Sequence, residues 1–193
     1  MFDRLFESIA GKVSLTTNEY EICKTLFIPK KLRKRQFLLQ KGDVCKYTAF
    51  VEKGILRSYT TDDKGNDHIL QFALEGWWMG DLYSFLTNEP SIYDMDALED
   101  CELLLITQPS WEELFEKVPA MERYFRILIQ NNLIATQRRL MGAMSQTAEE
   151  KYLQLVDTFP DCIQRVPQHM IASYLGITRE TLSRTRSQLA SRR

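Results

Sequence analysis

The stretch from Thr178 to Arg184 constrains the fold most, because read as a helix it has two chemically different faces. At 100° per residue, one side carries apolar or small side chains, namely Thr181, Leu182, Thr185 and Leu189. An arc of about 140° on the other side carries Arg179, Glu180, Ser183, Arg184 and Ser187. Arginine, glutamate and serine are the side chains that read guanine, cytosine and other base edges in DNA.

The residues before this helix predict a shorter helix and a tight turn. Thr178 is a suitable N-cap, because its hydroxyl can accept a hydrogen bond from a first-turn N–H. Upstream, Pro167 suits the first turn of a helix that runs to Leu175, and Gly176 stands where a left-handed residue ends a helix. Helix, turn and helix make a helix-turn-helix unit. A hairpin that only packs would leave the Arg/Glu/Ser/Arg face unexplained.

The run Arg179-Glu180-Thr181-Leu182-Ser183-Arg184 resembles the recognition helix of the CRP/FNR superfamily of bacterial transcription regulators, whose pattern is close to R-E-T-V-G/S-R. Members combine a β-roll of the cyclic-nucleotide-binding type, a long dimer helix and a winged helix-turn-helix. The resemblance implies a homodimeric, sequence-specific transcription regulator. Its expected partners are double-stranded DNA with a palindromic operator, a second copy of the chain, and RNA polymerase.

Within this motif we expect Arg179 and Arg184 to contact guanines and Glu180 to accept from cytosine. The full predicted DNA-binding set is Thr178, Arg179, Glu180, Ser183, Arg184 and Arg186, the last on phosphate at the flank. The family continues into a β-hairpin wing, whereas this sequence stops at Arg193. Either the domain lacks a full wing, with Arg192 and Arg193 as loose phosphate contacts, or the sequence is a truncated form.

The distribution of charge agrees with a DNA-binding end. The formal net charge of −1 would not by itself suggest nucleic acid. Residues 162–193 hold six arginines against one acid, Glu180, whereas residues 73–122 hold twelve acids against one base, Lys117. A basic end on an acidic body fits a DNA-binding domain whose neighbouring domain is repelled by phosphate.

Few residues could support catalysis or a metal centre. The two histidines, His68 and His169, are too few for a His-rich metal site or for a Ser/His/Asp set, so we expect a non-enzyme without a metal. The four cysteines lie far apart without a CxxC pair, which argues against a zinc ribbon and against an iron–sulfur cluster. No signal peptide and no apolar stretch of about 20 residues is found, so we expect a cytoplasmic protein without a membrane span.

Residues 36–106 predict an antiparallel β-roll, because short runs of β-branched and aromatic residues alternate with glycine-containing turns. The predicted strands are 36–40, 48–52, 55–59, 67–73, 92–98 and 101–106. A basic run from Lys30 to Lys41 is expected at the solvated edge of the first strand, with a nucleic-acid patch as the alternative. The fold class is α+β, and the resemblance makes the roll a double-stranded β-helix of the cyclic-nucleotide-binding type.

The run Gly76-Trp77-Trp78-Met79-Gly80-Asp81-Leu82 resembles the opening of the family's phosphate cassette, G-D-F-x-G-E-L. Nucleotide-binding members place an arginine about nine residues after the leucine, where this sequence has Ser91, and no arginine occurs in residues 73–122. Burying a phosphate without a cation is costly, so we expect no binding of cyclic AMP. The roll either takes another small-molecule effector or is filled by its own aromatic side chains. The expected ligand residues are Trp78, Gly80, Asp81, Leu82, Ser91 and Tyr93.

Helical patterns flank the roll. Residues 1–28 predict two helices, the second capped by Thr16 or Thr17 and ended by Pro29. A helix capped by Ser110 is expected to run to Lys117, and a longer one from residue 119 to 144. The last helix before the helix-turn-helix is expected to begin after Thr147 and to end at Pro160.

The long helix has two apolar stripes, where a surface helix needs only one. One stripe holds Phe125, Ile129, Leu133, Leu140 and Met144, and the other holds Ile127, Ile134 and Met141, which are spaced by seven. We therefore expect this helix to pack on the chain's own roll and also on a second partner, which the resemblance makes the same helix of a second subunit. A helix buried within one subunit is the alternative.

The predicted domains are a sensor at 1–118, a dimerisation helix at 119–144 and a DNA-binding domain at 145–193, with a hinge at 142–146. A signal in the roll would shift the long helices and change the separation of two recognition helices, which must lie about 34 Å apart to read one duplex face. The alternative is a small-molecule-binding regulatory protein whose helix-turn-helix mediates protein contacts.

Overall fold

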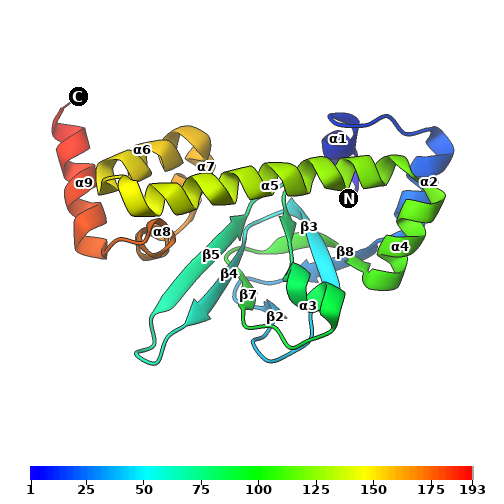
Figure 1. The fold of residues 1–193 in the computed structure, drawn as a ribbon, viewed down its shortest axis with the longest axis horizontal. Coiled ribbons are helices and arrows are strands. Elements are labelled where there is room, and N and C mark those ends of the chain that lie inside the picture. The colour runs from blue at the N-terminus through cyan, green and yellow to red at the C-terminus, as the bar shows by residue number, and fades with distance from the viewer. Residues whose placement is uncertain (193) are drawn as a thin grey trace. The chain divides into compact units, whose positions relative to one another are not determined.

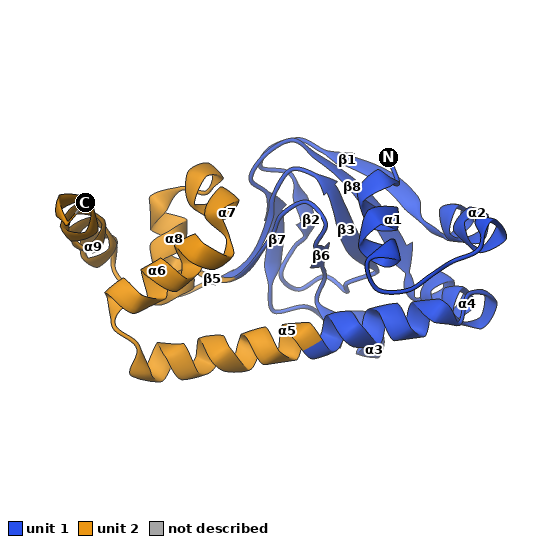
Figure 2. Ribbon diagram, turned by 90° about the horizontal axis from the view of Figure 1, so that it is seen from above, with its two compact units in different colours: residues 1–60, 71–130 blue, residues 61–70, 131–193 orange. Residues whose placement is uncertain are grey.

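The computed structural model describes residues 1–192 and divides them into two compact units (Figure 2). The first unit comprises residues 1–60 and 71–130, and the second comprises residues 61–70 together with the chain from residue 131 onward. The long helix α5, Ala120–Ser145, is therefore shared, since its first part belongs to the first unit and its remainder to the second. The predicted domain bounds instead placed this whole helix in a segment of its own.

Two four-stranded antiparallel sheets form the β-roll, which belongs to the first unit except for residues 61–70 (Figure 1). One sheet has the order β1 (Ile28–Leu32), β8 (Cys101–Thr107), β3 (Tyr47–Lys53), β6 (Trp78–Met79). The other has the order β2 (Phe37–Leu39), β7 (Asp94–Ala97), β4 (Leu56–Thr61), β5 (Asp67–Ala73). An apolar core that includes Leu39, Leu56, Met95 and Leu103 fills the roll. The predicted fold class, α+β with an antiparallel roll, is confirmed.

Each of the six predicted strands is present, with ends shifted by a few residues, but β1 and β6 were not predicted. Pro29 does not end the second helix, as the sequence suggested, because α2 (Thr17–Leu26) already ends at Leu26. Pro29 lies inside β1, opposite Leu104 of β8. Because β1 is the outermost strand of its sheet, the missing N–H of proline leaves no interior ladder bond unmade.

Helices α1 (Asp3–Ala10), α2 (Thr17–Leu26), α3 (Leu82–Thr87) and α4 (Gln108–Lys117) accompany the roll. The cap of α2 is Thr16, which forms a capping box with Glu19. The cap of α4 is Thr107 rather than the predicted Ser110, since the Thr107 hydroxyl accepts from the backbone N–H of Ser110 at 3.2 Å. The helix therefore begins two residues before the predicted cap, and Ser110 lies inside it.

A second apolar cluster joins these helices to the roll through Trp78. The Trp78 ring packs against Phe125 of α5, with ring centroids 4.9 Å apart, and its Nε1–H donates to the Tyr124 hydroxyl at 3.2 Å. Tyr124 is fully buried, and its hydroxyl also bonds to the Ser8 hydroxyl of α1 at 2.9 Å. One tryptophan of the cassette is thus fixed to the start of the long helix.

The helical domain of the second unit contains α6 (Ala148–Thr158), α7 (Pro160–Arg165), α8 (Gln168–Leu175) and α9 (Arg179–Ser191). Thr147 caps α6, as predicted, and forms a capping box with Glu150. Pro160 follows the end of α6 but also begins α7, which was not predicted, because proline fits a first helical turn. The buried residues of this domain are Tyr152, Leu155, Cys162, Val166, Ile171, Ala172, Leu182 and Thr185.

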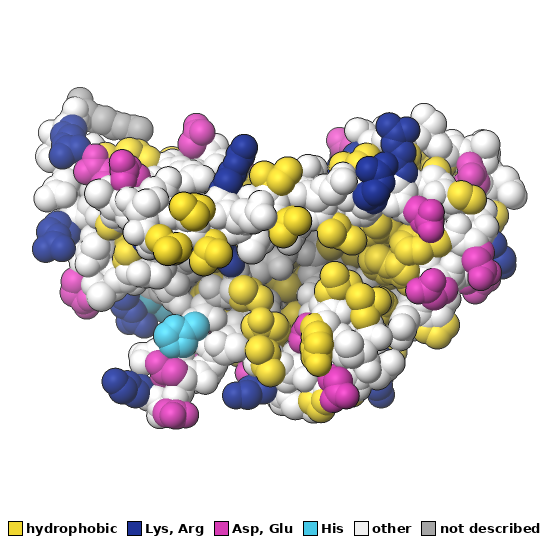
Figure 3. All heavy atoms as spheres, in the orientation of Figure 1, with side chains coloured by type: hydrophobic (Ala, Val, Ile, Leu, Met, Phe, Trp, Pro, Cys, Tyr) yellow, Lys and Arg dark blue, Asp and Glu magenta, His cyan; other side chains and the backbone are white. Residues whose placement is uncertain are grey.

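The apolar residues of α5 are mostly uncovered, which Figure 3 shows as hydrophobic side chains along that helix. Phe125 is buried against Trp78 of β6, which agrees with the expected packing of this helix on the roll. From Ile129 onward, the large apolar side chains of both stripes are exposed. The exposed fractions are Ile129 51%, Leu133 56%, Ile134 47%, Leu140 62%, Met141 61% and Met144 78%. Both stripes are therefore available to a partner.

The cysteines and the metal-binding residue types form no joint site in the described chain. All four cysteines are free and buried, and burial raises the pKa of the Cys23, Cys101 and Cys162 thiols to about 11. Across residues 1–192, no three His, Cys, Asp or Glu side chains gather as metal ligands would. None of the described helices is both long enough and apolar enough to cross a bilayer.

Candidate nucleic-acid interface

The predicted helix-turn-helix is present in helices α8 and α9. Gly176 ends α8 in the left-handed conformation, with φ 66°, and its backbone N–H donates to the Ser173 carbonyl at 3.0 Å. Thr178 then caps α9, since its hydroxyl accepts from the backbone N–H of Thr181 at 3.2 Å. Glycine provides the positive φ without steric cost, and the cap satisfies one of the free N–H groups of the new helix.

The inner face of α9 holds this helix in the domain. Leu182 and Thr185 are buried, and the same domain buries Ile171 and Ala172 of α8. These are the small and apolar positions that the helical periodicity assigned to the inner side. Because one face is fixed in this way, the opposite face is held outward.

The six residues predicted to contact DNA are all exposed: Thr178, Arg179, Glu180, Ser183, Arg184 and Arg186. Hydrogen bonds from its own backbone and from the Thr178 hydroxyl, together with Arg179, lower the pKa of Glu180. Glu180 is therefore ionised at neutral pH and offers only acceptors, which suits the amino group of cytosine. The hydroxyl of Thr178 is already used in the cap and bonds to the Thr181 hydroxyl at 3.0 Å.

A hollow of about 510 Å³ lies between the N-terminal end of α8 and one side of α9. Its lining residues are Gln168, His169, Arg179, Leu182, Ser183, Arg186, Ser187 and Ala190. Two arginines thus come together with Gln168 and His169, two residues that the sequence analysis did not assign to the site. A signal was present in the sequence, because Pro167 precedes α8 as a residue without a capping side chain, and the positive end of a helix dipole favours an anion.

Arg186 lines this hollow and Arg184 does not, so the two arginines have different surroundings. On a helical wheel Arg184 and Glu180 lie on the far side of Arg179 from Arg186. The two arginines can therefore do different work, one on base edges and one on phosphate. Arg192, expected as a phosphate contact, is ion-paired with Glu149 of α6, and Arg193 lies outside the described residues.

The cassette in the roll is closed by its own hydrogen bonds. Asp81 caps α3 by accepting from the Ser84 N–H at 3.3 Å, and it also accepts from the Ser91 hydroxyl at 2.8 Å. Asp81 and Ser91 are both buried. The position where nucleotide-binding members have an arginine thus holds a hydroxyl that donates to a carboxylate. A phosphate placed here would face a buried acid rather than a cation.

The other predicted ligand residues do not come together around one cavity. Trp78 lies in the aromatic cluster beside α5, and Leu82 is exposed on α3. Tyr93 packs, half-buried, on the core of the roll. Gly80 lies so close to β3 that a Cβ added there would be 3.0 Å from the Thr48 hydroxyl. The assignment of these residues to a ligand stays a prediction.

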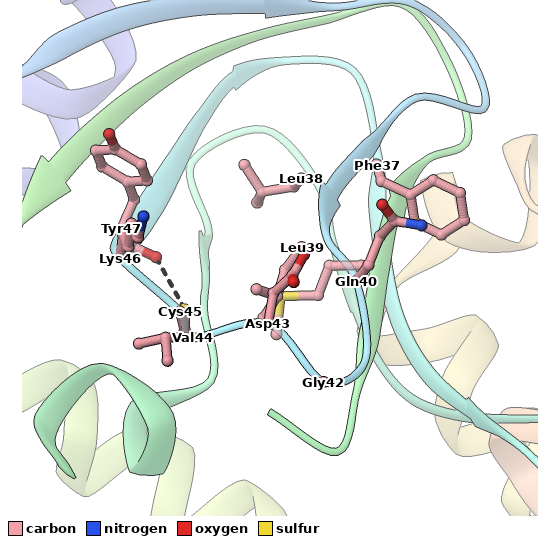
Figure 4. A pocket seen from close by; sticks show the side chains of 11 residues that line it. Phe37, Leu38, Leu39, Gln40, Gly42, Asp43, Val44, Cys45, Lys46 and Tyr47 are labelled. Atoms are coloured by element: carbon pink, nitrogen blue, oxygen red, sulfur yellow. Dashed lines mark hydrogen bonds between the residues drawn. The ribbon is translucent and has the colours of Figure 1, made fainter. Parts of the chain in front are cut away.

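A separate cavity of about 550 Å³ lies along β2 and the loop that follows it (Figure 4). Its lining residues are Phe37, Leu38, Leu39, Gln40, Gly42, Asp43, Val44, Cys45, Lys46, Tyr47 and Met95, none of which was predicted to bind a ligand. The Cys45 thiol donates to the Tyr47 carbonyl at 3.1 Å. Beside Met95 in the sheet stands Ser58, whose buried hydroxyl has no hydrogen-bond partner in the described chain.

Arg57, the residue before Ser58, is already ion-paired within the roll. Arg57 of β4 forms a two-pronged pair with Asp96 of β7, with nitrogen–oxygen distances of 2.7 and 2.9 Å. Its guanidinium also lies over the Tyr59 ring, 3.9 Å from the centroid. Because both partners are buried, removing Arg57 from Asp96 to meet a phosphate would leave a buried carboxylate unpaired.

We predict that cyclic AMP at 1 mM leaves the thermal midpoint of the protein unchanged, because Ser91 and Asp81 offer no cation to its phosphate. Differential scanning fluorimetry with and without the nucleotide measures this. A ligand present at about 100 times its Kd would stabilise the protein by about 2.7 kcal/mol, which the midpoint would report. A clear upward shift with cyclic AMP would contradict the reading of the cassette.

Known proteins resemble the chain in both parts. The cyclic nucleotide-binding domain family matches residues 29–118. The chain is 24% identical over 186 residues to the fumarate and nitrate reduction regulatory protein of Vibrio cholerae, which covers 89% of this chain and 74% of the relative. Two solved structures share the fold of this chain, each at 17% sequence identity to it. One is CLP of Xanthomonas campestris, described as a c-di-GMP responsive global regulator. It matches with a TM-score of 0.72 over 91% of this chain and 92% of the CLP chain. A regulator of the CRP/FNR family from Eubacterium rectale matches with a TM-score of 0.65 over 92% and 85%. In its roll, its cassette and its helix-turn-helix, the chain is similar to regulators of the CRP/FNR superfamily, and its residues 29–118 match the cyclic nucleotide-binding domain family.

Proposed function

We propose that the protein is a dimeric, sequence-specific DNA-binding transcription regulator that acts by binding rather than by catalysis. One observation carries the proposal: the exposed Arg/Glu/Ser/Arg face of α9 is backed by a buried face, within a capped two-helix unit. A helix held in this way can present its side chains to the major groove of a duplex. The named regulators that the chain resembles support the same function.

Each predicted DNA contact follows from the place of the side chain on α9. Arg179 and Arg184 are proposed to read guanines and Glu180 to accept from cytosine, while Ser183 contacts phosphate or a base edge. Thr178 is proposed to contribute from the cap position. Arg186 lines the hollow at the end of α8, where Arg179, Gln168 and His169 would surround a phosphate at the N-terminal end of that helix. The proposed interface therefore comprises Thr178, Arg179, Glu180, Ser183, Arg184 and Arg186.

The partner that covers α5 is proposed to be a second copy of the chain. From Ile129 to Met144 the helix exposes six large apolar side chains. An exposed apolar surface of this size usually marks an interaction site, because its contact with water is unfavourable. A parallel pairing about a two-fold axis would bury them and would duplicate the reading face. Two recognition helices about 34 Å apart then require a palindromic operator. RNA polymerase is proposed as the further partner, in the cytoplasm where the genome lies.

A salt titration tests DNA binding itself. Fluorescence anisotropy of a labelled duplex of random genomic sequence, at potassium chloride concentrations from 50 to 300 mM, should show affinity falling steeply as salt rises. The fall is expected because each phosphate that the protein neutralises releases counterions, with a slope of about −0.9 per phosphate. Absence of binding at the lowest salt would contradict the proposal and would favour a protein-contact role for the helix-turn-helix.

A further inference from the structure

The hairpin between β4 and β5 is a part of the roll that belongs to the second compact unit. Its residues 61–70 group with the helices of the DNA-binding domain (Figure 2). The turn is built on the Asp62 carboxylate, which accepts from the backbone N–H of Asn66 at 2.8 Å and of Lys64 at 2.9 Å. The Nε2 atom of His68 lies 3.0 Å from the same carboxylate. These bonds, the Asn66 N–H foremost, hold the pKa of Asp62 well below its ordinary value, so the turn keeps its charge at any physiological pH.

Ser173 of α8 bonds to the backbone of this hairpin at two points. The backbone N–H of Ile69 donates to the Ser173 hydroxyl at 3.0 Å, and that hydroxyl donates to the Asp67 carbonyl at 2.6 Å. β5 is the last strand of its sheet, so one of its edges has no strand beside it. The hydroxyl supplies an acceptor and a donor, as a neighbouring strand would.

Two further contacts join the same place to α5. The guanidinium of Arg139 donates to the Leu70 carbonyl, the next residue of β5. It also lies 4.9 Å from the centroid of the Tyr174 ring, beside Ser173 on α8. One cluster therefore contains a residue of the long helix, two of α8 and the backbone of the hairpin. We call the residues Asp67, Ile69, Leu70, Arg139, Ser173 and Tyr174 the hairpin latch.

We propose that the hairpin latch fixes the helix-turn-helix on the β4–β5 hairpin and so preorganises the reading helix for DNA. The latch lies on α8 and leaves Arg179, Glu180 and Arg184 exposed on α9. It therefore does not mask the reading face. A domain held at a fixed orientation loses less conformational entropy on binding than a domain free to turn about the hinge at 142–146. β5 continues from the latch as Gln71–Ala73, so the hairpin that Ser173 contacts is part of a strand of the roll.

The test is the variant Ser173→Ala in the full chain, with Thr158→Ala as a matched control. Thr158 is exposed on α6 of the same domain, and its hydroxyl bonds only within that helix, to the Gln154 carbonyl at 2.7 Å. In Ser173→Ala the Ile69 amide should exchange with solvent at least about tenfold faster by NMR, because it loses its acceptor. Affinity for a selected duplex should fall by about three- to tenfold with an unchanged base preference, as expected for one or two lost hydrogen bonds. Thr158→Ala should change neither quantity.

The inference rests on the proposed DNA binding, and the two can fail separately. Lack of wild-type binding to any duplex would remove the proposed function, while the Ile69 amide would still report whether the hairpin is held. Unchanged exchange at Ile69 in Ser173→Ala would show that no latch exists. Faster exchange with equal or tighter DNA binding would overturn the preorganising role, since a latch that restrains the domain away from DNA would give that result.

Discussion

Replacing Arg184 by alanine is expected to weaken binding to the operator by about 1–3 kcal/mol and to relax the preference at one base position in each half-site. The reason is its place on α9. Arg184 is exposed on the side of the helix that carries Glu180, away from the hollow that suits a phosphate. Because a dimer uses the residue twice, the loss should appear symmetrically in both half-sites. Competition binding with duplexes that differ at single positions measures both effects.

Arg186→Ala is the matched comparison, since it removes the same side chain two residues further along the helix. It is expected to weaken all duplexes about equally and to reduce the slope of log affinity against log salt by about 1 for each subunit. If Arg184→Ala instead weakened every sequence alike, its role in reading bases would be wrong. If Arg186→Ala changed the base preference, the assignment of the two arginines would have to be exchanged.

The double variant Ile134→Glu/Met141→Glu is expected to convert the dimer into monomers. Both side chains are exposed in the single chain and are seven residues apart, which places them on one stripe of α5. Burial of a large apolar side chain contributes about 1.5–3 kcal/mol, and each substitution occurs in both copies. The dissociation constant should therefore rise at least about a hundredfold, which corresponds to about 2.7 kcal/mol. Sedimentation equilibrium measures it.

Leu153→Glu is the control for this variant. Leu153 is an exposed leucine of α6, off the long helix, so the same kind of substitution should leave the dimer intact. DNA affinity should fall in the double variant alone, because a monomer presents one reading helix in place of two. A double variant that remained dimeric would contradict the use of α5 as the interface, as would a wild-type protein that is monomeric at micromolar concentration.

The DNA-binding end could be predicted in detail because its signals are local. A hydroxyl at residue 178, a glycine at 176 and a helical period in residues 178–189 each specify their own piece of backbone. The structure places Thr178 at the cap, Gly176 at positive φ and Leu182 inside, as predicted. The same holds for the cap at Thr147.

What could not be predicted depends on tertiary packing. Trp78 was predicted to line a ligand cavity because it lies in the cassette. It instead packs in the aromatic cluster beside the long helix, where Phe125 contacts its ring and Tyr124 accepts its hydrogen bond. The strand β1 was missed since an edge strand tolerates Pro29 and a run of lysines, which read as a break. Gln168 and His169 carry no motif, and only the packing of α8 on α9 brings them to the arginines.

Selection of bound duplexes from a library of random sequence tests most directly whether a dimer of this protein reads DNA. The wild-type protein is expected to enrich an inverted repeat whose half-sites contain guanine and cytosine and whose centres are about 10 base pairs apart, one turn of the duplex. The Ile134→Glu/Met141→Glu variant is expected to enrich no such repeat. Enrichment of nothing, or of a single unpaired half-site by the wild-type protein, would contradict a dimer that reads DNA through two α9 helices.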